Sequence, residues 1–193
     1  MQVGLVVAMV VALGSCSFIL GVLIPNEFVI DGTSYEVTKA YAVNWGLNVD
    51  GNYDIEIYLV PDTISIGSDG FLIGQGDYAW FWINTAAPVI GENSYPINTG
   101  ANFIPTTLYN AGVVRDFGKP IPFSDSLNYL ESGGVLDIST TVLGDEFIFD
   151  YVDGALITLG SFEAFFRGEL DQPLITASPS VVPSRSPLLQ RAE

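Results

Sequence analysis

Oxygen-bearing side chains alternate along one short stretch of the chain, at Asn48, Asp50, Asn52 and Asp54. Calcium takes six to eight oxygen ligands, and a loop with this spacing supplies several of them from one turn. The twelfth position counted from Asn48 is Leu59, however, where an EF-hand loop has a bidentate Glu. The favoured alternative is a hairpin loop whose Asp and Asn side chains bond their own backbone, with positive φ at Gly51.

A second stretch, Tyr78 to Ile83, is aromatic and apolar on both of its expected faces. In a strand, successive side chains point to opposite sides. Tyr78, Trp80 and Trp82 therefore share one face, and the intervening residues share the other. One face must be core, and the second is too apolar to lie bare. We expect the protein's own loops to cover it, and a ligand such as a sugar ring or a protein partner is the alternative.

The remaining chemistry is sparse. The chain has no His, which removes the commonest catalytic base and the commonest zinc ligand. Pairs of carboxylates can hydrolyse glycosides, and Asp145, Glu146 and Glu163 are such acids, but 22 acidic residues make a suggestive pair inevitable. The net charge of −16 argues against nucleic acid as a partner, because phosphates would be repelled. The sequence predicts a protein that is not an enzyme, with no cofactor beyond calcium.

Residues 1–24 carry no charged side chain. The run from Val3 to Leu13 has the character of the apolar core of a signal peptide. It ends in Leu13-Gly14-Ser15-Cys16, which resembles the lipobox of bacterial lipoproteins. That resemblance implies cleavage before Cys16 and lipid attachment through its sulfur, giving a membrane anchor. An uncleaved transmembrane anchor and an ordinary cleaved signal peptide are the alternatives. All three predict export.

These functional residues need a scaffold, and the pattern predicts one made of strands. Short alternating runs, such as Tyr53 to Val60, recur between Gly, Asp and Asn residues. Asp31-Gly32 and Asp153-Gly154 are two-residue turn signals, and only Ser124 to Leu130 suggests a turn of helix. We expect an all-β fold, an antiparallel β-sandwich of about 8 to 10 strands, with a lipocalin-like up-and-down barrel as the alternative.

Composition divides the chain into four predicted segments. Residues 1–15 form the signal peptide, 16–25 the lipid anchor or tether, 26–174 the all-β domain, and 175–193 a disordered tail rich in Pro and Ser.

Several motifs of this chain resemble those of a loose group of small, mostly uncharacterised surface lipoproteins common in Bacteroidetes. After the lipobox, the shared features are a strand ending in Asp-Gly with a nearby Tyr (28–35), a Gly-x-x-x-Tyr segment (91–95), a Gly-Gly strand (132–138) and a C-terminal hairpin (153–170). The resemblance implies an all-β domain on the cell envelope, with the outer membrane as the expected location. It implies no enzymatic activity.

Together these observations predict a non-catalytic, lipid-anchored envelope protein. Its acidic β domain would bind a glycan or a protein partner, or serve a structural role at the surface. A carboxylate-based hydrolase acting on polysaccharide and a subunit of an envelope assembly are the alternatives.

Overall fold

The computed structural model describes residues 25–98, 104–119 and 127–171. The predicted signal peptide, Cys16 and the predicted tail lie outside these ranges. Every named element within them is a strand. None of the described residues belongs to a helix that could cross a bilayer.

The described residues form thirteen strands. They are β1 (Glu27–Ile30), β2 (Thr33–Glu36), β3 (Lys39–Leu47), β4 (Tyr53–Val60), β5 (Ile64–Ile66), β6 (Leu72–Gly74), β7 (Gly76–Thr85), β8 (Asn93–Pro96), β9 (Thr107–Phe117), β10 (Leu127–Thr140), β11 (Phe147–Leu156), β12 (Gly160–Gly168) and β13 (Leu170–Asp171). Eleven of them make one sheet in the order β13-β3-β4-β7-β9-β10-β11-β12-β1-β2, with β8 paired to β10. β5 and β6 form a separate hairpin.

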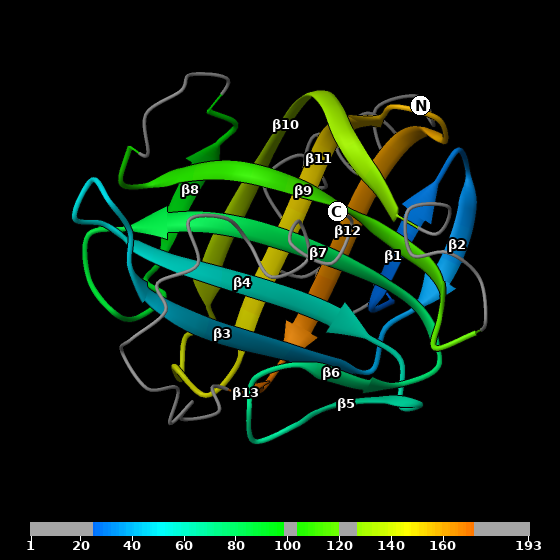
Figure 1. The fold of residues 1–193 in the computed structure, drawn as a ribbon, viewed down its shortest axis with the longest axis horizontal. Helices are drawn as coiled ribbons and strands as arrows, with labels where there is room; N and C mark the ends of the chain where they lie inside the picture. Colours follow the sequence, from blue (N-terminus) through cyan, green and yellow to red (C-terminus); the bar gives the residue numbers. More distant parts are fainter. Residues whose placement is uncertain (1–24, 99–103, 120–126, 172–193) are drawn as a thin grey trace, which may run out of the picture.

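The large sheet curls so that its strands lie in two layers (Figure 1). β3, β4, β7 and β9 run side by side in one layer, and β11 and β12 cross behind them. β10 belongs to both layers, because its first residues, 127–129, pair with β9 and the rest pair with β11. It changes direction at a register shift followed by Gly133 and Gly134, both of which have positive φ.

The far end of the sheet turns back toward β3. After β12 the chain continues at once into β13, which pairs in parallel with Ala40 and Tyr41 of β3. All the other strand pairs of the described residues are antiparallel. The result is a curled, mixed sheet with the shape of a half-barrel.

The all-β class predicted from the sequence is confirmed, whereas a sandwich of two separate sheets is not confirmed. The strands are more numerous than the expected 8 to 10. Asp31-Gly32 forms the predicted turn, with positive φ at both residues. Asp153-Gly154 was expected to be a turn, which is wrong: it is a bulge inside β11. The expected helical turn is also wrong for residues 127–130, which begin β10.

Two apolar clusters lie on opposite sides of the first layer. The inner cluster combines residues of both layers, and in it Phe81 stacks on Phe162 at 5.9 Å between ring centroids. The outer cluster draws mainly on β3, β4, β7 and β9, so it lies on the face turned away from the second layer. Because both faces of this layer are buried, its strands have few exposed side chains.

Candidate functional site

The aromatic row of β7 lies on the outer face. Tyr78, Trp80 and Trp82 belong to the outer cluster, and Ala79, Phe81 and Ile83 belong to the inner one. The alternation predicted from the sequence is therefore confirmed. Trp82 is only 2% exposed, and the other two members of the row are completely buried.

Further aromatic rings surround this row. Trp82 lies 4.4 Å from Tyr109, and Trp80 meets the ring of Tyr129 edge-on at 6.2 Å. The β5–β6 hairpin adds Ile64, Ile66 and Leu72 to the same cluster. The protein's own hairpin thus covers part of the aromatic face.

Two carboxylates share this apolar face. Asp54 and Glu56 are two residues apart on β4, so both side chains lie on the same side of the strand. In the sheet register Asp54 is opposite Asn84 and Glu56 is opposite Trp82. Asp54 is 8% exposed, and Glu56 and Asn84 are completely buried. Burying an ionised carboxylate is costly, so each needs hydrogen-bond donors nearby.

The sequence provides those donors locally. The indole Nε1 of Trp45 donates to Glu56 Oε2 at 3.0 Å, and the hydroxyl of Tyr58 donates to the same oxygen. Nδ2 of Asn48 donates to Asp54 Oδ1 at 2.9 Å. Burial raises the pKa of Asp54, and hydrogen bonds from Asn48 and Trp82 partly oppose that rise.

Asn48 also organises the loop between β3 and β4. Its Oδ1 accepts hydrogen bonds from the backbone N–H groups of Asp50 and Asn52, each at 3.0 Å. Gly51 has a φ of +80°, as a tight turn of this kind requires. This is the self-bonded hairpin loop that the sequence favours. No group of three or more Cys, Asp or Glu side chains suited to a metal ion occurs in the described ranges.

Two buried N–H donors on β7 bond to no acceptor in the described part of the chain. They are Nδ2 of Asn84 and Nε1 of Trp80. The Asn84 amide lies among the acids, since its Oδ1 accepts a 3.1 Å hydrogen bond from the same Asn48 nitrogen that binds Asp54. Buried polar groups almost always have partners, so an unused donor beside carboxylates needs an explanation.

The structure thus brings together two groups of residues that the sequence indicated separately. We call the combined group the carboxylate–aromatic cluster; it consists of Trp45, Asp54, Glu56, Tyr58, Trp80, Trp82 and Asn84, with Asn48 at its edge. Sequence reasoning missed Trp45, Glu56, Tyr58 and Asn84 as members. The alternation of β4 puts Glu56 beside Asp54, but only the register with β7 puts it beside Trp82.

A second feature is a cavity of about 550 Å³ where β3, β12 and β13 meet. Its polar lining residues include Asn26, Lys39, Arg167 and Glu169. Lys39 Nζ already binds Asp62 at 3.1 Å. Positive and negative groups are mixed around this cavity, so its charge favours no particular ligand.

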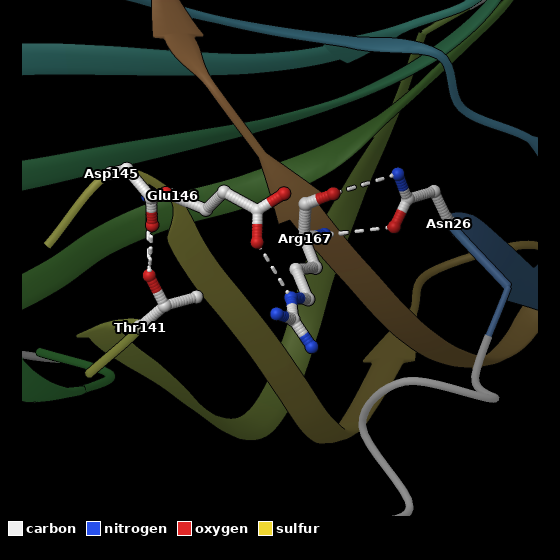
Figure 2. A network of polar contacts seen from close by, with 5 residues as sticks. All are labelled: Asn26, Thr141, Asp145, Glu146 and Arg167. Atoms are coloured by element: carbon white, nitrogen blue, oxygen red, sulfur yellow. Dashed lines mark hydrogen bonds and ion pairs between the residues drawn. The ribbon is translucent and has the colours of Figure 1, made fainter. Parts of the chain in front are cut away.

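Figure 2 shows how the side chains beside that cavity are held. The side chain of Asn26 forms hydrogen bonds with both backbone groups of Arg167. Its Nδ2 donates to the carbonyl oxygen at 3.0 Å, and its Oδ1 accepts from the N–H at 2.8 Å. Nε of Arg167 binds Glu146 Oε2 at 2.9 Å, and Thr141 donates to the neighbouring Asp145 at 2.6 Å. These contacts join the loop between β10 and β11, strand β12 and the residue before β1, and we interpret them as structural.

Comparisons with protein-family models, with curated protein sequences and with solved structures find no match to this chain. The carboxylate–aromatic cluster therefore has to be interpreted from its own chemistry. Its acids can accept hydrogen bonds, and its N–H groups that have no described acceptor can donate them to a ligand. Its rings offer flat apolar faces. Such a group can bind a polar ligand, and two neighbouring carboxylates can also exchange protons with a substrate.

Proposed function

We propose that this chain is an exported, lipid-anchored protein of the bacterial cell envelope whose β domain is a non-catalytic binding module. The observation that carries the binding role is the unused Nδ2 of Asn84 beside Asp54 and Glu56. A purely structural network would be expected to use all of its buried donors, because each unused one costs about 1–3 kcal/mol. A binding site keeps such donors for its ligand.

The anchoring role is supported by the sequence before the domain. The uncharged leader and the Leu13–Cys16 motif fit the signal peptide and lipobox of a lipoprotein. The likeness to surface lipoproteins of Bacteroidetes supports the same anchor and suggests the outer membrane as its location. From Cys16 to Asn26 an extended chain reaches at most about 36 Å. The β domain of an anchored protein would therefore stay close to the membrane surface.

The finer fold assignment is also part of the proposal. Two crossing layers with one core between them support the antiparallel sandwich expected from the sequence. The continuous curl through β10 and the return of β13 to β3 support the barrel alternative.

Metabolic labelling with radioactive palmitate tests the anchor. The wild-type chain should take up label and stay with the membranes, and Cys16→Ala should lose the label and appear in the soluble fraction. Because Cys16 is the only cysteine, no other thiol can take its place. An unlabelled wild-type chain would reject the lipid anchor.

A second candidate function, carboxylate-based hydrolysis of polysaccharide, is favoured by the position of Asp54 and Glu56 on one face of β4 among aromatic rings. Two such carboxylates are sufficient for glycoside hydrolysis when they flank the scissile bond. Release of reducing sugar from neutral polysaccharides tests this function. Hydrolysis that is lost in Glu56→Gln and kept in Glu163→Gln, an exposed acid of the other layer, would establish it.

A further inference from the structure

We infer that the carboxylate–aromatic cluster binds a neutral oligosaccharide. This inference rests on the proposed binding function and names the ligand class of the same site. It starts from the two unused donors, Asn84 Nδ2 and Trp80 Nε1, which are completely buried on the face that carries Asp54 and Glu56.

The cluster offers hydrogen-bond donors and acceptors side by side. Asn84 is opposite Asp54 in the sheet register, so its unused N–H lies beside a carboxylate. Trp80 shares that face of β7, and its Nε1 lies toward β9, close to Gly112. Donors alone would suit an anion, and carboxylates alone would suit a cation. A hydroxyl group both donates and accepts, so it can receive a bond from the amide and give one to the neighbouring carboxylate. Interleaved partners of this kind suit a molecule with several hydroxyl groups.

Charge narrows the class of saccharide. Two carboxylates in a poorly solvated setting would repel uronic acids and sulfated sugars strongly, because burial weakens the screening of charge. Asp54 and Glu56 can instead accept hydrogen bonds from uncharged hydroxyls, and charge-assisted bonds of this kind are stronger than bonds between neutral groups. The ligand should therefore be neutral.

The spacing of the donors indicates the length of the ligand. Asn84 and Trp80 are four residues apart on β7, which corresponds to about 13 Å along the strand. One sugar ring does not span that distance, so a ligand that meets both donors needs at least two linked units. Trp82 lies between the two donors on the same face, and its ring could lie against a sugar that takes the place of Tyr109.

Access to these groups would come through the rim of the cluster. Trp45 and Tyr109 are only partly buried, and they pack against the buried rings. A ligand would first meet these two side chains, and it would reach the donors of β7 once the ring of Tyr109 moves away from Trp82, while Trp45 stays bonded to Glu56. Rotation of side chains at a binding surface is common even where the backbone stays in place.

The test uses the full-length chain in a detergent without sugar headgroups, followed by isothermal titration calorimetry. The neutral probes are cellohexaose, maltohexaose and the hexamer of N-acetylglucosamine, and the acidic probe is hexagalacturonate. At least one neutral probe should bind, its monosaccharide should bind much more weakly, and hexagalacturonate should not bind.

Trp80→Phe is the decisive variant, because it removes one N–H that bonds to no described acceptor and keeps an aromatic ring. It should weaken binding of the neutral probe about two- to tenfold, as expected for one lost hydrogen bond. Asn84→Ala should weaken binding in the same way and serves as the second variant if Trp80→Phe unfolds. Tyr151→Phe, which changes a hydroxyl in the inner cluster, should leave the affinity unchanged.

Each other result overturns the inference in a recognisable way. Binding of hexagalacturonate alone would reject the neutral class and keep the binding function. Binding that is unchanged in both Trp80→Phe and Asn84→Ala would reject the site. If no probe binds while Cys16 still carries palmitate, the saccharide inference fails and the anchored envelope protein remains.

Discussion

Asn48 and Asp54 stand on opposite sides of the β3–β4 loop, and Nδ2 of Asn48 lies 2.9 Å from Oδ1 of Asp54. The same amide group reaches β7, where it donates to Asn84 at 3.1 Å, and its oxygen holds two backbone N–H groups of the loop. One side chain therefore fixes the turn and orients both an acid and an amide of the carboxylate–aromatic cluster.

Replacing Asn48 by Ala should destabilise the domain by about 3 kcal/mol. The change removes two donated and two accepted hydrogen bonds, each of which contributes about 0.5–1.5 kcal/mol. Urea denaturation of the two proteins measures the difference. Val49→Ala, in the same loop but 80% exposed, is the control and should change stability by less than about 0.5 kcal/mol. Equal effects of the two changes would show that the Asn48 bonds contribute little.

Asp54 should make the folded state less stable as the pH rises. Burial raises its pKa above the ordinary 3.8, so between that value and the folded-state pKa the folded chain holds more protons than the unfolded chain. Stability falls with pH wherever the folded state binds more protons. The stability of Asp54→Asn relative to wild type should therefore improve as the pH rises from about 4 through the raised folded-state pKa of Asp54.

The control for that experiment is Asp62→Asn. A hydrogen bond from Lys39 lowers the pKa of Asp62, so its pH-dependent contribution is lost only as the pH falls below 3.8. The stability gap between Asp62→Asn and wild type should stay flat above about pH 5. Urea denaturation midpoints at four pH values give the stability difference from wild type as a function of pH for each variant. A difference that does not change with pH for Asp54→Asn would contradict the effect of burial on its pKa.

Gly134→Ala should destabilise the domain by more than about 2 kcal/mol. A Cβ at this position would lie 2.0 Å from the hydroxyl oxygen of Tyr151, and the backbone has a φ of +92° that side chains other than Gly rarely adopt. Gly91→Ala is the matched control, since nothing lies within 4 Å of its added Cβ. Thermal unfolding should show a large loss for the first variant and almost none for the second.

Asn26→Ala should cost more stability than Arg167→Gln. Asn26 satisfies both backbone groups of Arg167, and losing it leaves a part-buried N–H and carbonyl without those partners, at about 1–3 kcal/mol. The ion pair from Arg167 to Glu146 is about one third exposed at each side chain, so it contributes less than about 1 kcal/mol. Chemical denaturation ranks the two variants, and the reverse order would show that the ion pair dominates this junction.

The periodicity of the sequence predicted which residues share a face, but not which faces are covered. On β4, Asp54 and Glu56 alternate with Ile55 and Ile57 as expected. The burial of the acids depends on β7, which comes later in the chain and sets Asn84 and Trp82 opposite them. Local alternation carries no information about those distant neighbours.

Turn signals were reliable only where two strands pair with each other directly. Asp31-Gly32 joins β1 to β2 with positive φ at both residues. Asp153-Gly154 has the same residue types but lies within β11, where it bends the strand past Tyr151. The same dipeptide suits a bulge and a turn, because both need positive φ. The sequence did not indicate Asn84 as a site residue, because a single Asn at the end of a strand usually indicates a loop.

The hydrogen bonds between Asn26 and Arg167 join residues 141 positions apart. β1 pairs with β2 as soon as that hairpin is made, but its other edge pairs with β12, from Glu27 with Phe165 to Ile30 with Phe162, so that edge has no partner until almost the whole domain has been made. Contacts this distant in sequence are slow to form. The nascent chain would then carry an unpaired β1 edge throughout synthesis, and a chain that stops before residue 160 could not complete the sheet. Such truncated products should be aggregation-prone and good substrates for proteases.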